Sequence, residues 1–259
     1  MTAVTEERPT LDLSHTPKVP LVRLVQVELR KMADTRAGMW LLIAIAAITA
    51  AIIVIFFFAA PESERTFGNF IGVTATPQGF LLPVLGILLV TSEWGQRTAL
   101  VTFTLTPVRG RVLVAKVIGA VLLGLASILV ATAVAALATV VAGTSDPWQG
   151  IGWDSFGKFS LLQTIAILQG LAFGLLILNS AAAIVTFFLV PTAFTILASI
   201  WTRMAEIQPW VDLGFSQGPL FSGENITGEQ WQQLASGFAI WVVLPFVLGT
   251  WRVLRSEVK

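Results

Sequence analysis

The stretch FSLLQTIAILQGLAFGLLILNSAAAIVTFFLVPTAFTILASIW, residues 159–201, decides the fold because it holds 43 residues without a charged side chain. As one helix it would be about 64 Å long, whereas the hydrocarbon core of a membrane is only about 30 Å thick. The stretch must therefore fold back on itself, and Asn179-Ser180 is the polar pair near its middle. We expect two membrane spans, residues 159–178 and 181–201, joined by a very tight turn.

The rest of the chain is similarly apolar. Of its 259 residues, 55% are hydrophobic and 12% are charged, against roughly 25% charged in a soluble domain. The mean hydropathy of +0.81 excludes an ordinary soluble enzyme. We predict an all-α integral membrane protein with six transmembrane helices, the other four covering residues 39–60, 70–91, 117–142 and 234–251. In the span 70–91, Pro77 and Pro83 should cause a kink or an unwound first turn, because a proline removes a backbone donor.

The distribution of Lys and Arg predicts the topology, because positive residues are retained on the cytoplasmic side. Thirteen of the 16 fall before the first span, between the second and third spans, or after the last span; the other three are Arg65, Lys158 and Arg203. This distribution requires an even number of spans and places both termini in the cytoplasm. We therefore predict a multi-pass protein of the plasma or inner membrane. The net charge of +1 gives no reason to expect a nucleic-acid partner.

The segments outside the spans have distinct patterns. Residues 1–16 are expected to form a disordered tail, and residues 20–34 an amphipathic helix on the inner membrane face. A short helix packed on a soluble partner is the alternative for the second segment. The outer loop, residues 202–233, is too apolar for a simple loop and should re-enter the membrane or cap the bundle. Thr227 and Gln230 have the spacing of a capping box, so a helix should begin there and continue into the last span.

The predicted spans contain no ionisable residue, whereas ion-coupled carriers usually have one. Gln163, Gln169 and Asn179 are expected to form hydrogen bonds between helices. The segment 152–159 approaches a phosphate-binding loop but has Phe159 where a magnesium-binding Ser or Thr is needed. With no Cys and one His, we expect no catalytic site and no metal site in this chain.

Small residues at four-residue spacing predict close helix packing, either within the subunit or between two copies. One pair is Gly170 and Gly174, in the fourth span. The second set lies in and just after the third span and comprises Ser127, Ala131, Ala135, Thr139 and Gly143.

The inner loop, residues 92–116, reads SEWGQRTALVTFTLTPVRGRVLVAK. Glu93 and Arg97 are four residues apart and would face one another on a helix, which Pro107 would end. A solvated positive loop would explain the arginines, but not Glu93, Trp94 and the apolar run 99–105. An exposed amphipathic helix in this position needs a partner.

The same loop carries a resemblance to a known family. Its Glu93-Trp94, Thr98, Leu105, Pro107, Arg109, Arg111 and Ala115-Lys116 resemble the membrane subunits of type-2 ABC transporters. Glu28-Leu-Arg-Lys31, the segment 179–183 and the tail 254–258 fit the same family, so the resemblance covers essentially the whole chain. Gly95-Gln96 departs from relatives that carry more basic residues there, which would weaken electrostatic docking.

The resemblance implies that residues 17–259 form one permease domain with six helices, an interfacial elbow helix and a re-entrant outer segment. It implies a homo- or heterodimer paired with two ATPase subunits, which bind ATP and Mg; this chain would hold no cofactor. The elbow helix would contain Glu28, Arg30 and Lys31. The residues that couple to the ATPase would be Glu93, Trp94, Arg97, Thr98, Pro107, Arg109, Arg111 and Lys116, with Asn179 and Ser180 as a smaller contact.

The leading functional hypothesis is a permease that exports an apolar or amphipathic compound, driven by the separate ATPase. The second and fifth spans would line the path, with Phe187, Phe188, Thr195 and Ser199 as candidate residues. The alternatives are an ion-coupled secondary carrier and a non-transporting membrane scaffold or immunity protein.

Overall fold

The computed structural model describes residues 19–96, 98–106, 108–148, 152–221 and 225–255, and these residues contain helices but no strand. Six helical segments are long and apolar enough to cross a membrane, as expected of a multi-pass membrane protein. They are α2 (Arg36–Ala59), α3 (Phe67–Gly95), α5 (Arg109–Ala142), α6 (Trp153–Ile177), α7 (Ser180–Ile200) and the continuous run Gly228–Arg255. The predicted tail, residues 1–16, lies outside the described residues.

The uncharged stretch folds back where the sequence predicts it. Helix α6 ends at Ile177, and Leu178 adopts the left-handed conformation with φ 58°. Asn179 then caps α7, because its side-chain oxygen accepts the backbone N–H of Ala182 at 3.0 Å. Two residues are thus enough to reverse the chain, and the tight turn is confirmed.

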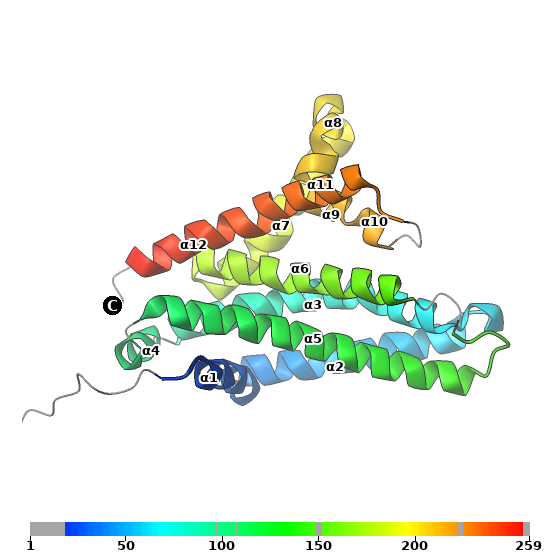
Figure 1. The fold of residues 1–259 in the computed structure, drawn as a ribbon, viewed down its shortest axis with the longest axis horizontal. Coiled ribbons are helices and arrows are strands. Elements are labelled where there is room, and N and C mark those ends of the chain that lie inside the picture. Colours follow the sequence, from blue (N-terminus) through cyan, green and yellow to red (C-terminus); the bar gives the residue numbers. More distant parts are fainter. Residues whose placement is uncertain (1–18, 97, 107, 149–151, 222–224, 256–259) are drawn as a thin grey trace, which may run out of the picture.

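Helices α3 and α6 form the centre of the bundle (Figure 1). Their backbones approach closely at glycines: a Cβ atom added to Gly170 would lie 2.0 Å from the Pro83 carbonyl oxygen, and one added to Gly86 2.3 Å from the Ile167 oxygen. Gly174 faces Ile87 in the same seam. These small residues therefore pack helices within the subunit, and α3 remains helical through both of its prolines. The expected unwound first turn is absent, because Thr66 caps the helix well before Pro77.

The small residues of α5 also pack inward. Ser127, Ala131, Ala135 and Thr139 are buried, and Ala135 contacts a cluster that contains Ile53 of α2 and Phe70 of α3. Gly143, the last position of that stripe, ends the helix in the left-handed conformation, with φ 60°. Its role is thus to terminate α5 rather than to extend the packing surface.

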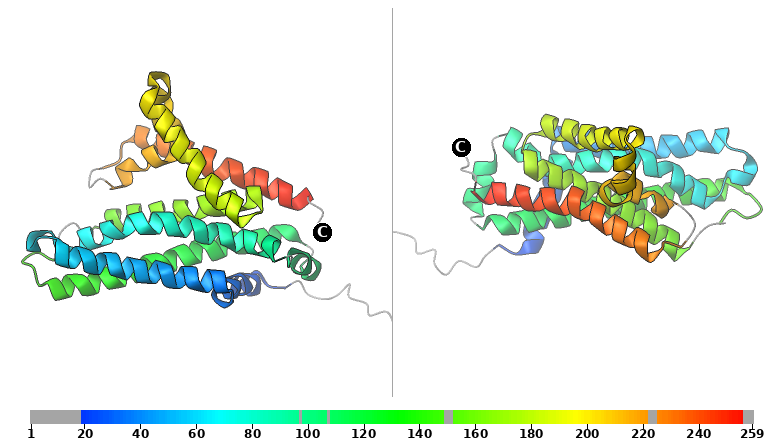
Figure 2. Two further views of the ribbon diagram at one scale, coloured as in Figure 1. Left: turned by 180° about the vertical axis from the view of Figure 1, so that it is seen from behind. Right: turned by 90° about the horizontal axis from the view of Figure 1, so that it is seen from above.

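The outer segment consists of α8 (Thr202–Val211), α9 (Leu213–Ser216) and α10 (Gly218–Phe221), followed by α11 (Gly228–Phe238). Leu213 of α9 and Leu220 of α10 belong to an apolar cluster with residues of α6 and α11, so these short helices cover that part of the bundle. Helix α7 leans away from the bundle and carries α8 at its far end (Figures 1 and 2).

The start of the last span confirms the capping box: Thr227 accepts the N–H of Gln230, and the Gln230 side chain accepts the N–H of Thr227. From there, α11 continues through the π-helical turn η2 (Ala239–Val243) into α12 (Leu244–Arg255). The predicted span, residues 234–251, therefore lies within a longer helical run, Gly228–Arg255.

The two ends of the described chain lie at the same end of the bundle (Figures 1 and 2). Helix α1 (Leu21–Asp34) leads into α2 through Thr35, which caps α2. At the other terminus, Arg109 of α5 donates a hydrogen bond to the Val253 carbonyl of α12 at 2.8 Å. This placement agrees with the even number of crossings deduced from the charges.

We predict that Gly170→Ala lowers the free energy of unfolding by about 1–3 kcal/mol, because the new methyl group would overlap the Pro83 backbone. Gly157→Ala, in the same helix, adds a methyl group with no atom within 4 Å and should be neutral or stabilising by up to about 1 kcal/mol. Thermal unfolding of both purified variants in detergent measures the difference. Equal unfolding temperatures would show that the α3–α6 seam is not as close as described.

Candidate functional site

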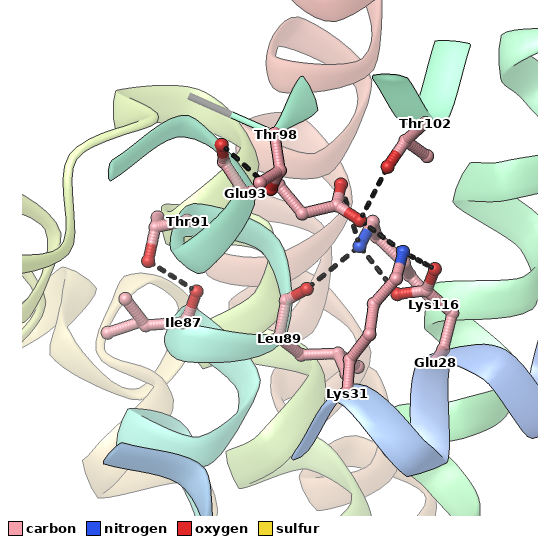
Figure 3. Close-up of polar contacts among 9 residues, drawn as sticks. All are labelled: Glu28, Lys31, Ile87, Leu89, Thr91, Glu93, Thr98, Thr102 and Lys116. Carbon is pink, nitrogen blue, oxygen red and sulfur yellow. Dashed lines mark hydrogen bonds and ion pairs between the residues drawn. The ribbon is translucent and has the colours of Figure 1, made fainter. Parts of the chain in front are cut away.

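Four charged side chains meet where α1, α3 and α5 converge, at the end of the bundle that carries both ends of the described chain (Figure 3). We call Glu28, Lys31, Glu93 and Lys116 the charge cluster. Glu28, Glu93 and Lys116 are only 3%, 4% and 3% exposed, whereas the side chain of Lys31 is 32% exposed. The cluster is therefore buried except for one edge.

Each lysine in the cluster bridges both carboxylates. The Nζ atom of Lys116 lies 2.6 Å from Glu28 Oε2 and 3.2 Å from Glu93 Oε2, and it also donates to the Leu89 carbonyl at 3.0 Å. The Nζ atom of Lys31 lies 2.8 Å from Glu28 Oε1 and also pairs with Glu93. Two negative and two positive charges thus alternate and cancel. Such full pairing is what makes burial of charges tolerable in a low dielectric.

Local sequence explains why these side chains point inward. Val25, Glu28 and Met32 lie on one face of α1 and are the buried residues of that helix. Glu28 thus occupies a core position between two apolar residues. Burial alone lowers the pKa of Lys31, but the carboxylates of Glu28 and Glu93 outweigh burial and raise that pKa above its ordinary value. Lys31 therefore stays positively charged at neutral pH and keeps the cluster neutral overall.

The cluster also holds the short helix α4 (Ala99–Leu105). The Thr102 hydroxyl of α4 donates to Glu93 Oε1 at 3.3 Å, and the Thr98 backbone N–H donates to the Glu93 carbonyl at 2.9 Å. Inside the fold, Ala99 and Phe103 are buried in the main core. A displacement of α4 would therefore act directly on Glu93 and, through its ion pairs, on α1 and α5.

The opposite face of α4 is apolar and exposed. Leu100, Val101 and Leu105 are 49%, 55% and 75% exposed, and we call them the α4 outer face. Helix α4 lies at the end of the bundle that also holds α1 and the start of α5 (Figure 1). The sequence prediction of a short amphipathic helix in the inner loop is confirmed, although α3 and α4 are separate helices rather than one.

The residues that the family resemblance implies for ATPase coupling divide into three groups. Glu93 and Lys116 are buried in the charge cluster, and Trp94 packs near Phe103 with ring centroids 6.5 Å apart. Arg97 and Pro107 lie outside the described residues, so the proposed Glu93–Arg97 pair has no structural counterpart to report.

The remaining coupling candidates make contacts within the chain. Arg109 caps α12 and lies over Phe103, and Arg111 donates to the Val19 carbonyl at 2.5 Å. Asn179 caps α7, and the Ser180 hydroxyl lies 2.7 Å from that of Thr91. Thr98 is exposed, and its backbone N–H donates to the Glu93 carbonyl; Arg30, expected in the elbow helix, is also exposed.

In the sequence, Glu28 and Lys31 fall in the expected elbow helix and Glu93 and Lys116 among the expected coupling residues. That these four side chains meet was not predicted. A signal was present, since a carboxylate in the apolar stripe of α1 requires a buried cation. The predicted absence of ionisable residues from the spans also needs a qualification. Glu93 and Lys116 lie within α3 and α5, because both helices continue beyond the predicted span ends. Mutual neutralisation makes this extension possible.

The proposed translocation residues do not form one group. Phe187 lines a cavity of about 240 Å³ between α3, α6, α7 and the outer segment. Phe188 stacks on Phe80 with ring centroids 5.7 Å apart. Thr195 instead donates to the buried Asp212, and Ser199 donates to a backbone carbonyl of its own helix.

The chain matches no protein-family model and no curated protein. Within the described residues there is also no group of His, Asp or Glu side chains that could hold a metal ion. Functional inference therefore depends on the charge cluster, the α4 outer face and the cavity.

We predict that Lys116→Met lowers the free energy of unfolding by about 3–5 kcal/mol, because it leaves two buried carboxylates facing Lys31 alone. Adding Glu28→Gln should restore part of the loss, since Glu93 and Lys31 then form a neutral pair. The control is Arg30→Met, which removes an exposed cation from α1 and should change stability by about 0.5 kcal/mol or less. Denaturant unfolding of the purified variants measures these differences; the cluster would not be stabilising if Lys116→Met and Arg30→Met unfolded alike.

Proposed function

We propose that this chain is the permease subunit of an ATP-binding-cassette transporter and that a separate ATPase docks on the α4 outer face. The observation that carries the proposal is the placement of α4. One of its faces is buried in the core, the other is apolar and exposed, and Thr102 joins the helix to the charge cluster. An exposed apolar patch at the end of a bundle, rimmed by polar residues, is typical of a protein interface.

The charge distribution supports a cytoplasmic position for this surface. The same end of the bundle holds α1, the start of α5 and the end of α12, where most of the Lys and Arg residues are concentrated. Under the positive-inside rule this end faces the cytoplasm, where ATP is available. The ATP and Mg would be bound by the partner subunits, two per complex.

The charge cluster supports a role for α4 in transmitting force. Helix α4 contacts Glu93 on α3, and Glu93 is paired with Lys31 on α1 and Lys116 on α5. Movement of a docked ATPase would thus be passed to three helices together. In this proposal α1 is the interfacial elbow helix, α9 and α10 are the re-entrant outer segment, and a second permease subunit completes the complex.

The proposed cargo is an apolar or amphipathic compound that is exported. The predicted spans carry no unpaired charge that would favour an ionic substrate, and α7 is largely exposed apolar surface. With α3, α7 would line the path at the interface between two subunits. Phe187, which lines the cavity, is the residue of the proposed path that the contacts favour most.

We predict that the double variant Leu100→Ser/Val101→Ser loses a copurifying ATPase while still being produced and inserted. Both side chains are about half exposed, so their replacement should not disturb the core. The measurement is mass spectrometry of the tagged chain purified from its native membrane in mild detergent. A soluble protein with its own phosphate-binding loop should be recovered near one-to-one with the unaltered chain. The buried Glu93 is unsuitable for this test, because its replacement would disrupt the charge cluster.

The matched control is Val140→Ser/Val141→Ser, which makes the same change at exposed positions near the other end of α5 and should retain the ATPase. Recovery of the chain alone, with transport that needs an ion gradient rather than ATP, would overturn the proposal in favour of an ion-coupled carrier. Recovery of a partner without ATPase activity, and without transport, would favour a scaffold or immunity protein.

A further inference from the structure

The cavity between α3, α6, α7 and the outer segment has an apolar wall with a few polar groups. Its volume is about 240 Å³, below the roughly 300–1,000 Å³ of sites that enclose a whole drug-sized molecule. It therefore suits a small molecule or one end of a longer one. The residues that line it include Gly79, Phe80, Pro83, Gln169, Phe187 and Gln217. None of the described residues that line the cavity is charged.

Gln169 is the polar residue of this wall that most needs a partner. It is 9% exposed, and its carboxamide makes no hydrogen bond to any residue that the structure describes. Gln163 donates to Gln78 at 2.9 Å and Gln78 donates to Thr49, although Oε1 of Gln163 has no partner among the described residues. The Gln169 carboxamide differs from both because it borders the cavity, and at membrane depth lipid offers it no hydrogen bond.

Two prolines each remove a backbone donor close to this wall. Pro83 has no N–H, so the carbonyl of Gly79, four residues earlier in α3, receives no hydrogen bond from it. Pro191 of α7 has the same effect on the carbonyl of Phe187. Gly79 and Phe187 both line the cavity. Two helices from different parts of the chain thus each bring to the cavity a residue that lacks the usual donor four residues later.

These groups define the chemistry of a ligand. The carboxamide of Gln169 has an oxygen that accepts and an NH₂ group that donates, so a ligand group that does both, such as a hydroxyl, suits it best. The described residues of the wall offer no cation for a carboxylate and no counterion for an ammonium group. Phe80 and Phe187 supply apolar surface for the rest of the molecule.

We propose that this cavity binds the donor-bearing end of a neutral amphipathic molecule, such as the hydroxyl end of a long-chain alcohol, with Gln169 as its hydrogen-bond partner. The site lies within a single chain and requires no ATPase. The site coincides with the part of the proposed path that contains Phe187, so it specifies the ligand of that path and in this respect rests on the proposed function; the binding test needs neither ATPase nor transport, so the two can fail separately.

The test uses the purified full-length chain in lipid nanodiscs and three photoactivatable probes with the same alkyl chain: an alcohol, its methyl ether and the corresponding fatty acid. Labelling is located by peptide mass spectrometry. We expect the alcohol to label α3, α6 or α7 next to the cavity at least about tenfold more than the ether or the acid. Equal labelling by the alcohol and the ether would overturn the proposal, because it would reflect partitioning into lipid alone.

Gln169→Leu keeps the size of the side chain and removes the carboxamide. It should reduce labelling by the alcohol at least about tenfold and reduce labelling by the ether less, because the ether accepts a hydrogen bond but donates none. Unchanged labelling by the alcohol in a folded Gln169→Leu protein would overturn the assignment of Gln169 as the hydrogen-bond partner.

A second pair of variants tests the location. Gly79→Leu places a side chain where no atom lies within 4 Å, at the cavity wall, and should abolish specific labelling. Gly72→Leu makes the same change in open space on the same helix, away from the cavity, and should not. Equal labelling of the two variants would place the binding site elsewhere. Native mass spectrometry of Gln169→Leu and the unaltered chain distinguishes a retained membrane lipid from a molecule that has to be added.

Discussion

Burial of charge inside an apolar bundle is possible here only because two carboxylates and two ammonium groups neutralise each other within a few ångströms. The arrangement of α1, α3, α4 and α5 at this end depends on that requirement. If α3 or α5 moved away alone, it would leave an unpaired buried charge behind, and if α1 moved away, Glu93 and Lys116 would each lose one of their two partners. The charge cluster therefore makes the elbow, two spans and the inner loop behave as one unit, whereas α7 has no comparable link to the rest.

The sequence predicts the parts of this fold that depend on local chemistry. Apolar length identifies the six spans, because partition between lipid and water acts on each segment separately. Asn179 and Thr227 mark helix starts for a similarly local reason, since each caps the helix that immediately follows it. The charge cluster could not be located in this way. Its contacts join residues 62 and 88 positions apart, and spacing along one helix carries no information about such pairs. Glu28 within an apolar stripe indicates that a partner exists, but not which one.

The same limit applies to the cavity. The prolines of α3 and the fifth span are visible in the sequence, and each must leave one carbonyl without its usual donor. That Gly79, Phe187 and Gln169 share one cavity depends on how closely α3 and α6 pack, which is set by Gly86, Gly170 and Gly174. Thr195 and Ser199 are also expected to line the path, but their hydroxyl groups donate to other oxygens.

Helix α3 connects the two regions, because it carries Glu93 of the charge cluster near one end and the cavity residues Gly79 and Pro83 near its middle. Its glycine seam with α6 allows little sliding, since the backbones are already in contact. A push on α4 should then move α3 and α6 together as a block. Helix α7 is joined to that block at one end by the turn at Asn179 and by the hydrogen bond between Ser180 and Thr91, and it leans away at the other. Phe187, at the cavity, packs with Ile87 of α3 and Phe173 of α6, so this part of α7 should follow the block, and the part of α7 beyond Phe187 should follow it least.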